Sequence, residues 1–330
     1  MRIVVFGAGA VGSVIGGRLH AARATHGHDI TLVARGPHRD AITAHGLTIN
    51  DHSGATTVDV PAVATIAEVA LDDGDVVLST MKTQDTPSAL EQLAAHAPSG
   101  VRVVCAQNGV ENERLALRHF EHVYGICVML PSTFLEPGVV DAHGAPHNAI
   151  LDIGRYPSGA DATSETVAAV LRSSGLASES RPDIMRWKYA KLVMNLRNAI
   201  DALVSDPDQA DPLIAAARSE AEECFRAAGI DRAGDDEDRD RRSGVMEMAA
   251  VRGGSGGRRG GSTWQSLARG SSTTEVDWLN GEIVLLGRMH AVATPVNELL
   301  CQVTRWVVAS GRGPRSLTSA QVLGWRRSDP

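Results

Sequence analysis

A lysine and an asparagine stand one helical turn apart in the chain, and together they could assist the reduction of a carbonyl group. Lys191 and Asn195 lie within residues 182–199, whose apolar periodicity predicts a helix. Side chains four residues apart share one face of a helix. The ammonium could protonate an oxygen that becomes negative as hydride arrives, and the amide could hold the substrate. The same spacing is common on solvated helix faces, so the pair alone leaves both interpretations open.

The N-terminus carries a second pattern with chemical meaning. The apolar run at residues 3–6 leads into glycines spaced G-x-G-x-x-G and then into an apolar pattern of helical period. Such glycines allow a tight turn, close approach to a pyrophosphate and close helix packing, and the phosphates contact the helix N-terminus. A glycine-rich turn with no ligand is the alternative. The predicted cofactor-binding residues of this turn are Gly7, Gly9, Ala10, Val11 and Gly12.

The residue that ends the second predicted strand indicates which dinucleotide would bind. Arg35 lies 23 positions after Gly12 (35 − 12), near the place where NAD-binding folds have an acid for the ribose hydroxyls. A guanidinium would bind a 2′-phosphate that an acid would repel. The sequence therefore favours NADPH/NADP+ over NADH, with a solvated surface arginine as the alternative.

Two polar turns follow later predicted strands. Lys82 comes after the strand at residues 75–80, and Asn108 comes after the strand at 101–106. Open α/β sheets bind ligands at the carboxyl ends of their strands. Both residues are therefore candidates for contact with the cofactor. A solvated loop lysine and an ordinary turn remain the alternatives.

The predicted elements form two domains. Strands alternate with helices up to residue 181, which predicts an α/β, Rossmann-type doubly wound sheet, with a Pro/Gly-rich loop at 131–145. From residue 182 the apolar period is three to four and clear strands disappear, so we expect an all-α domain over 182–330. Residues 231–261 mix charges and glycines, which predicts a flexible segment, or alternatively a lid.

The composition of the chain indicates which classes of binding partner to expect. The formal net charge is −7, which gives no reason to expect nucleic acid or an anionic membrane. No apolar run approaches the roughly 20 residues of a membrane span, and the N-terminus lacks a signal-peptide layout, so we expect a cytoplasmic protein. The four cysteines and twelve histidines show no metal-ligand spacing, so no metal is predicted. The expected partner is a small-molecule substrate; a homodimer is compatible with the sequence, which does not fix the oligomeric state.

Taken together and in order, these motifs resemble the ketopantoate reductase family over nearly the whole chain. The resemblance implies a Rossmann domain followed by a helical domain, with NADPH as the reductant. It also implies reduction of a small 2-oxo acid to the 2-hydroxy acid, most simply 2-dehydropantoate to pantoate. The motifs that carry it are the strand-glycine opening, Lys82, Gln107-Asn108-Gly109, Trp187-x-x-x-Lys191-Leu192-x-x-Asn195 and Glu275-Val276-Asp277-Trp278-x-Asn280-Gly281.

The resemblance assigns roles by position. Lys191 matches the family's catalytic lysine, and Asn195 matches its substrate-side asparagine. Glu275 matches the acid near the lysine and the substrate hydroxyl. Lys82 and Asn108 match positions of the cofactor cleft.

Two departures concern the substrate end. The family often has a second asparagine four residues after the first, but Ala199 stands there, with Asn198 one step early and turned by about 100°. The family's Ser-Ser-Met stretch appears as Ser262-Thr263-Trp264, which keeps a hydroxyl at Thr263. Asn198 and Thr263 are therefore predicted substrate-binding residues. Two alternatives stay open: a reductase of a different keto or imine substrate in a biosynthetic pathway, and a non-catalytic NADPH-binding sensor.

Overall fold

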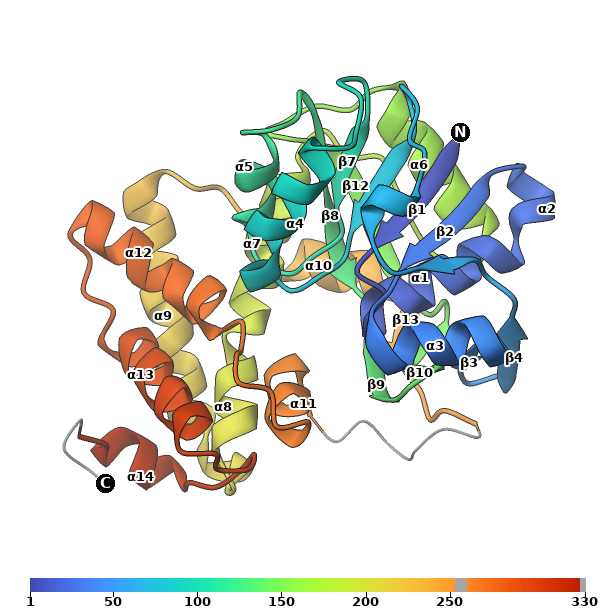
Figure 1. Ribbon diagram of the computed structural model, residues 1–330. Coiled ribbons are helices and arrows are strands. Elements are labelled where there is room, and N and C mark those ends of the chain that lie inside the picture. Colours follow the sequence, from blue (N-terminus) through green and yellow to red (C-terminus); the bar gives the residue numbers. More distant parts are fainter. Residues whose placement is uncertain (253–259, 327–330) are drawn as a thin grey trace. The chain divides into compact units, whose positions relative to one another are not determined.

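The computed structural model describes residues 1–252 and 260–326, and the chain divides into two compact units. Unit 1 comprises Met1–Lys188 and Ala233–Arg258, and unit 2 comprises Tyr189–Arg232 and Arg259–Pro330. The division falls inside helix α7 (Ile184–Asn195), shortly after the predicted boundary at 181/182. Unit 1 contains the sheets and unit 2 is helical (Figure 1).

Unit 1 is built on a seven-stranded sheet with the order β12-β8-β7-β6-β1-β2-β5. Its strands are parallel except β12, which runs antiparallel to β8. Because both faces of these apolar, β-branched strands are buried, they read as continuous hydrophobic runs. The predicted Rossmann-type sheet is confirmed. The strands are β1 (Arg2–Phe6), β2 (Asp29–Val33), β5 (Ala62–Val63), β6 (Val76–Ser79), β7 (Arg102–Cys105), β8 (His122–Met129) and β12 (Ile150–Arg155).

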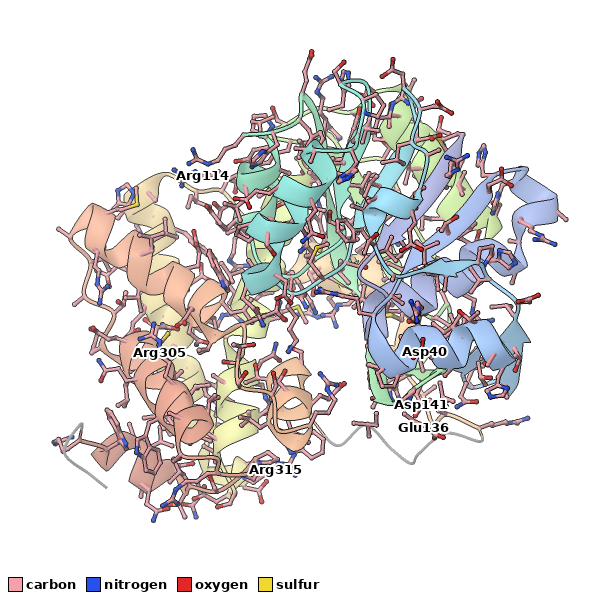
Figure 2. All side chains as sticks on the ribbon, viewed as in Figure 1. Asp40, Arg114, Glu136, Asp141, Arg305 and Arg315 are labelled. Carbon is pink, nitrogen blue, oxygen red and sulfur yellow. The ribbon has the colours of Figure 1, made fainter. Side chains whose placement is uncertain are left out.

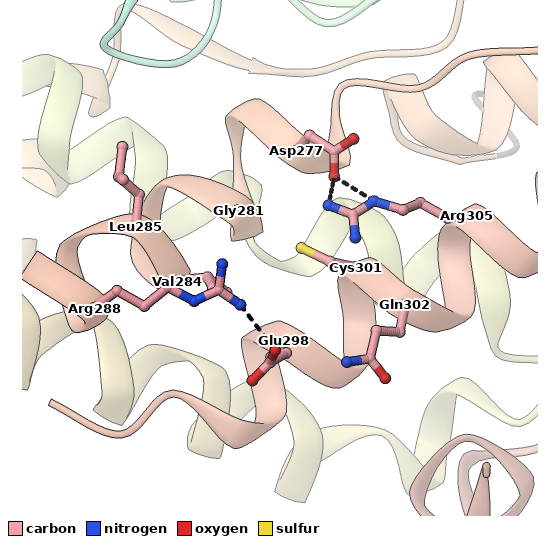
Figure 3. Close-up of a pocket in the computed structure, with 9 residues that line it drawn as sticks. All are labelled: Asp277, Gly281, Val284, Leu285, Arg288, Glu298, Cys301, Gln302 and Arg305. Carbon is pink, nitrogen blue, oxygen red and sulfur yellow. Dashed lines mark hydrogen bonds and ion pairs between the residues drawn. The ribbon is translucent and has the colours of Figure 1, made fainter. Parts of the chain in front are cut away.

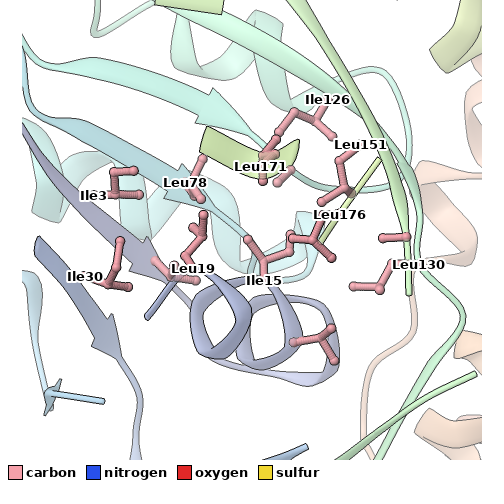
Figure 4. Packing of buried hydrophobic residues seen from close by; sticks show 14 of the residues in the cluster. Ile3, Ile15, Leu19, Ile30, Leu78, Ile126, Leu130, Leu151, Leu171 and Leu176 are labelled. Carbon is pink, nitrogen blue, oxygen red and sulfur yellow. The ribbon is translucent and has the colours of Figure 1, made fainter. Parts of the chain in front are cut away.

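Helices cover both faces of this sheet. Alternate residues of β1 enter different cores, with Ile3 in one cluster and Val4 in the other. Ile15 and Leu19 of α1 pack beside Ile3 in the first cluster (Figure 4). The second cluster contains apolar residues of α4. The helices of this unit are α1 (Ala10–Ala21), α2 (Arg23–His26), α3 (Gly36–His45), α4 (Thr86–Ala94), α5 (Asn112–Ala116) and α6 (Ala162–Ser173), with 3₁₀ turns η1 (Ile66–Glu68) and η2 (Thr83–Asp85).

The prediction of a loop at 131–145 is wrong. Its residues form β9 (Ser132–Glu136), β10 (Val139–Ala142) and β11 (Gly144–Pro146). β9 and β10 join β3 (Leu47–Asn50) and β4 (Ala55–Val58) in a second sheet with the order β4-β3-β10-β9. Proline and glycine lie at the ends of these short strands. Because such a composition is typical of loops, the strands were not predicted.

The prediction of a flexible segment at 231–261 is also wrong over most of the described part. Residues there form α10 (Asp235–Arg242) and β13 (Met246–Met248), and β13 pairs with β11. Arg241 of α10 donates from Nε and one terminal nitrogen to Asp152 of β12, at 2.8 and 2.6 Å. The charge run therefore supplies ion-pair partners for unit 1. Residues 253–259 of the predicted segment lie outside the described residues.

Unit 2 is a set of helices around one apolar core, as expected for the C-terminal domain. The expected all-α domain over 182–330 is wrong for residues 233–252, which belong to unit 1 and include strand β13. The core includes Ile200, Leu213, Leu300 and Val303. Within the described residues no helix is long and apolar enough to span a membrane. The helices are α8 (Arg197–Leu203), α9 (Asp211–Ala228), α11 (Ser262–Ala268), α12 (Asn280–His290), α13 (Pro295–Ala309) and α14 (Ser319–Gly324), with 3₁₀ turns η3 (Pro207–Gln209) and η4 (Val276–Trp278).

Candidate active site

The glycine turn between β1 and α1 gives each glycine a distinct role. Gly7 has a φ of +103°, and a Cβ there would come within 2.7 Å of the Met81 backbone nitrogen. A Cβ at Gly12 would come within 2.5 Å of Thr80 Oγ1, because α1 packs close against the neighbouring loop. A Cβ at Gly9 would meet nothing within 4 Å. Two glycines therefore serve packing, and Gly9 leaves open space for a ligand to approach the backbone.

The start of α1 presents backbone donors beside that space. Gly9 is the N-cap, and the Ser13 nitrogen donates to the Gly9 carbonyl oxygen at 2.9 Å. The N–H groups of Ala10, Val11 and Gly12 precede this bond in the first turn and have no acceptor within the helix. Such N–H groups, at the positive end of a helix dipole, bind phosphate. The five predicted residues thus form an arrangement that fits a dinucleotide pyrophosphate.

Arg35 lies at the same edge of the sheet. The backbone nitrogens of Gly7 and Ala8 both donate to the carbonyl oxygen of Val33, at 3.1 and 3.0 Å, so the end of β2 abuts the glycine turn. Arg35 comes two residues later, is exposed, and is the N-cap of α3. An exposed guanidinium at this strand end is available to a phosphate on the ribose of a bound dinucleotide.

The turns that carry Lys82 and Asn108 are joined by the side chain of Gln107. Its Nε2 donates to the Met81 carbonyl oxygen and to Thr86 Oγ1, both at 2.8 Å. Because β6 and β7 are neighbours in the sheet, their carboxyl ends lie side by side. Lys82 follows Met81 and Asn108 follows Gln107, so this amide fixes the backbone next to both candidates.

Asn112, at the start of α5, completes the connection. Its Nδ2 donates to Thr83 Oγ1 at 3.2 Å and to the Asn108 carbonyl oxygen at 3.1 Å, and its Oδ1 accepts from Thr86 Oγ1 at 2.8 Å. Asn112 and Thr83 are 0 and 1% exposed. The two turns are therefore held by a buried polar network rather than by apolar packing alone.

In unit 2, the predicted helix over 182–199 is broken. α7 ends at Asn195, Leu196 is in a turn, and α8 begins at Arg197. Across this break Asn198 Nδ2 lies 3.5 Å from Asn195 Oδ1. Residues three apart are neighbours on one face of a helix, and Leu196 keeps helical φ and ψ angles of −57° and −31°, so the two asparagines stay close in spite of the break. Lys191, which is half-buried, lies one turn before Asn195 on α7.

The asparagine pair lies beside α11. Asn198 Nδ2 is 3.4 Å from Ser262 Oγ, and a Cβ at Gly261 would come within 2.7 Å of Asn198 Oδ1. Thr263 is 2% exposed. The structure therefore brings Asn195, Asn198 and the Ser262-Thr263 segment into one region of unit 2.

Glu275 is the residue directly before the 3₁₀ turn η4. Its side chain is buried, with 8% exposed. Asn280, five residues later, donates from Nδ2 to the Leu196 carbonyl oxygen at 3.2 Å and to Asn297 Oδ1 at 3.0 Å. The segment that follows Glu275 is thus tied to the α7–α8 break.

A pocket of about 150 Å³ lies between α12 and α13, apart from these residues (Figure 3). Its walls include the ion pairs Asp277–Arg305 and Arg288–Glu298. Cys301 also lines it, and burial raises the pKa of the thiol to about 12. None of the predicted site residues lines this pocket.

Charged side chains lie on the surfaces of each unit, among them Arg114 on α5 and Arg305 on α13 (Figure 2). Within residues 1–252 and 260–326, no three or more His, Cys, Asp or Glu side chains are grouped so that they could hold a metal ion. All four cysteines are buried and free.

Comparison with known protein families gives a match in each of the two units. The family model described as ketopantoate reductase PanE/ApbA matches residues 3–158, and the model of its C-terminal part matches residues 183–307. The chain belongs to the ketopantoate reductase family. It is therefore an oxidoreductase of a family that uses a nicotinamide cofactor.

Relatives of this ketopantoate reductase family member match nearly its whole length. The 2-dehydropantoate 2-reductase of Pyrococcus horikoshii is 29% identical over 96% of this chain and 100% of its own, and that of Halobacterium salinarum is 30% identical over 94% and 100%. The crystal structure of a PanE/ApbA family ketopantoate reductase from Ralstonia eutropha JMP134 matches with a TM-score of 0.77 and 27% identity over 94% of this chain and 99% of that one. The ternary structure of D-mandelate dehydrogenase with NADH and anilino(oxo)acetate, 22% identical with a TM-score of 0.78 over 94% and 99%, shares the fold.

The supporting residues of this family member were missed by sequence reasoning. Thr80 and Asn112 stand directly beside predicted motifs, and Asn280 belongs to one without a role assigned to it, because the partners of these residues are distant in sequence. The available signal was composition: several uncharged polar residues follow strands that are otherwise apolar. Such residues at a strand's carboxyl end are candidates for a network as well as for a ligand.

Proposed function

We propose that this protein reduces a small 2-oxo acid to the 2-hydroxy acid with NADPH, and that 2-dehydropantoate is its most direct substrate. The observation that carries this proposal is the position of Lys191 one helical turn before Asn195, which contacts Asn198 across the break in α7–α8. A proton donor beside two amides suits a substrate that has a reactive carbonyl and a carboxylate. Full-length relatives named 2-dehydropantoate 2-reductase support the substrate.

Each group has a defined task in this proposal. The nicotinamide cofactor, when bound, supplies the hydride. Lys191 donates a proton to the carbonyl oxygen as negative charge develops there. Asn195, Asn198 and Thr263 orient the substrate through hydrogen bonds, and Glu275 positions the lysine or a substrate hydroxyl.

Unit 1 supports the choice of cofactor. The N–H groups of Ala10, Val11 and Gly12 would hold the pyrophosphate, and Lys82 and Asn108 would contact the ribose or nicotinamide portion. Arg35 would form charge-assisted hydrogen bonds with a 2′-phosphate, which favours NADPH. The D-mandelate dehydrogenase with the same fold was solved with NADH, so the preference needs a direct test.

A second candidate is a reductase that uses the same residues on a different keto or imine substrate. Ala199 stands where the family often has its second asparagine, and Trp264 stands where it has a thioether. A Cβ at Gly260 would come within 2.4 Å of Trp264 Cγ, so the indole lies directly against the Gly260 backbone. A bulkier wall of this kind would change the shape that the substrate must have.

The test is oxidation of NADPH by the purified protein, followed by absorbance. 2-Dehydropantoate should be offered beside pyruvate, 2-oxoisovalerate, 2-oxo-2-phenylacetate and a cyclic imine. Turnover on 2-dehydropantoate that exceeds the others by about 100-fold or more in kcat/KM would support the first candidate. Preference for another acid or for the imine would favour the second. NADPH binding without turnover on the panel would favour the sensor.

A further inference from the structure

A buried ion pair lies directly behind the turn that carries Asn108. Lys188 of α7 and Glu113 of α5 have side chains that are 2 and 0% exposed, and Lys188 Nζ lies 2.5 Å from Glu113 Oε1. Both residues belong to unit 1. An ammonium has three protons, and the other two directions are used as well. Nζ donates to the carbonyl oxygens of Gln107 at 3.0 Å and Ile126 at 3.2 Å.

Stability alone does not account for this pair. Removing two charges from water is costly, and well-packed apolar residues of the same size often replace a buried ion pair with no loss of stability. Burial raises the pKa of the Glu113 carboxyl, and the Lys188 charge works against that rise. What apolar residues would not replace is the directional bond from Nζ to the Gln107 carbonyl.

That bond continues into the two cofactor turns. The Gln107 backbone is held by Lys188, while its side chain holds the Met81 carbonyl oxygen and Thr86 Oγ1. Asn112, the neighbour of Glu113, binds Thr83 and the Asn108 carbonyl oxygen. Both residues of the ion pair therefore attach to the network that fixes the two turns.

We propose that Lys188 and Glu113 are positioning residues for the cofactor: they hold the turns at 81–86 and 107–112 in the conformation that binds the nicotinamide nucleotide. This inference rests on the proposed function for the identity of the ligand. The ordering of the two turns does not depend on it. Lys188 is thus distinct from Lys191, three residues later on the same helix, which is the proposed proton donor.

Three variants test the role. Lys188→Met keeps the length of the side chain and removes the donor. The double variant K188M/E113M also removes the unpaired carboxylate. Arg241→Met is the matched control, because it removes a cation, 9% exposed, from an ion pair with Asp152 in the same unit without touching either turn.

The two substitutions at the ion pair should separate stability from binding. Lys188→Met should lower the melting temperature because it leaves Glu113 buried and unpaired, and the double variant should recover part of that loss. Both should raise KM for NADPH by about tenfold or more, with KM for the 2-oxo acid changed by less than about twofold, because neither restores the donor to Gln107. Arg241→Met should leave KM for NADPH unchanged.

Hydrogen exchange gives a readout that does not need activity. Amides within 81–86 and 107–112 should lose protection in both ion-pair variants, while those of β12 and α6 keep theirs. If the double variant recovers stability together with wild-type KM for NADPH and wild-type protection, the pair is merely structural and the inference is overturned. If the wild-type protein binds no nicotinamide nucleotide, the proposed function fails, and exchange at the two turns alone decides whether the pair orders them.

Discussion

The glycine turn of unit 1 and the α7–α8 break of unit 2 represent two ways of building a site. The glycine turn presents backbone: open space at Gly9 and N–H groups at the start of α1. At the α7–α8 break the site is made of side chains, and Asn195 and Asn198, three residues apart, lie in contact. A site made of backbone groups requires glycines at fixed positions, so the sequence pattern alone predicts it. A site made of side chains depends on contacts between segments that are distant in the chain, so the sequence pattern alone does not predict it.

The sharpest test of the backbone site is a side chain added at Gly9. Gly9→Val should fold normally, because nothing lies within 4 Å of a Cβ there and φ is −86°. It should weaken NADPH binding by about 100-fold, since the valine occupies the space needed by the pyrophosphate. Fluorescence titration with NADPH measures the loss.

Gly12→Val should differ from that variant by acting on stability. A Cβ at Gly12 would come within 2.6 Å of the Gly7 carbonyl oxygen, so this change should lower the free energy of unfolding by about 1–3 kcal/mol. Wild-type NADPH affinity in Gly9→Val would contradict the assignment of the turn as the pyrophosphate site.

The side-chain site should depend on Asn280, whose buried amide group donates to the backbone at the α7–α8 break. Asn280→Ala removes the donor to the Leu196 carbonyl oxygen and to Asn297 Oδ1, both of which belong to buried residues. The expected loss in the free energy of unfolding is about 2–3 kcal/mol. Denaturant titration measures it. Asn198→Ala, whose contacts are 3.4 and 3.5 Å long, should cost clearly less; equal losses would show that Asn280 does not have the proposed role.

Arg35 tests whether the edge of unit 1 recognises a phosphate. Arg35→Asp should weaken NADPH binding by about tenfold relative to NADH, because it replaces charge-assisted hydrogen bonds with repulsion. Arg39→Asp is the control, since Arg39 is on the same helix but paired with Asp40. Equal losses for NADPH and NADH in Arg35→Asp would remove Arg35 from the phosphate site.

The smallest expected effect concerns a histidine behind the glycine turn. His38 Nδ1 accepts from the Gly138 nitrogen at 2.9 Å, and its Nε2 lies 3.0 Å from Ser13 Oγ, which donates to the Ala8 carbonyl oxygen. Burial lowers the pKa of His38 below its usual 6.5. The folded protein therefore resists a proton that the unfolded chain accepts.

The contribution of His38 to the free energy of unfolding should therefore be fully present above pH 6.5. It should decrease as the pH falls below 6.5. The loss is limited to about 1.4 kcal/mol per pH unit for one group. Comparison with His38→Gln, which can still accept from Gly138 and donate to Ser13, isolates this contribution in thermal melts at several pH values. A pH dependence identical in both proteins would contradict a neutral His38 in the folded state.

Local pattern was sufficient for the parallel sheet. The central strands β1, β6, β7 and β8 are buried on both faces, so each appears as an apolar run in the sequence, and the predicted sheet was confirmed. The segment at 131–145 was mistaken for a loop because β10 pairs with β3 and β11 pairs with β13, both of which are far away in the sequence. The helix at α10 was missed because its partner, Asp152, is on β12.

The residues of unit 2 were harder to predict for a related reason. The periodicity of residues 182–199 predicts a single helix, whereas the structure has α7 and α8 with Leu196 between them. Asn280 from another helix donates to the Leu196 carbonyl oxygen. Lys188 and Lys191 also look alike in sequence. Only tertiary structure shows that Lys188 is buried against Glu113. The roles predicted for Lys191, Asn195 and Glu275 stay predictions.

The most direct test of the proposed reduction is Lys191→Ala, with NADPH affinity and turnover on the preferred 2-oxo acid measured on the same sample. Lys191 belongs to unit 2, and the proposed NADPH site belongs to unit 1. We predict that the dissociation constant for NADPH changes by less than about twofold, while turnover falls by about 100-fold or more. Wild-type turnover in this variant, or loss of NADPH binding in step with turnover, would contradict the role of Lys191 as proton donor.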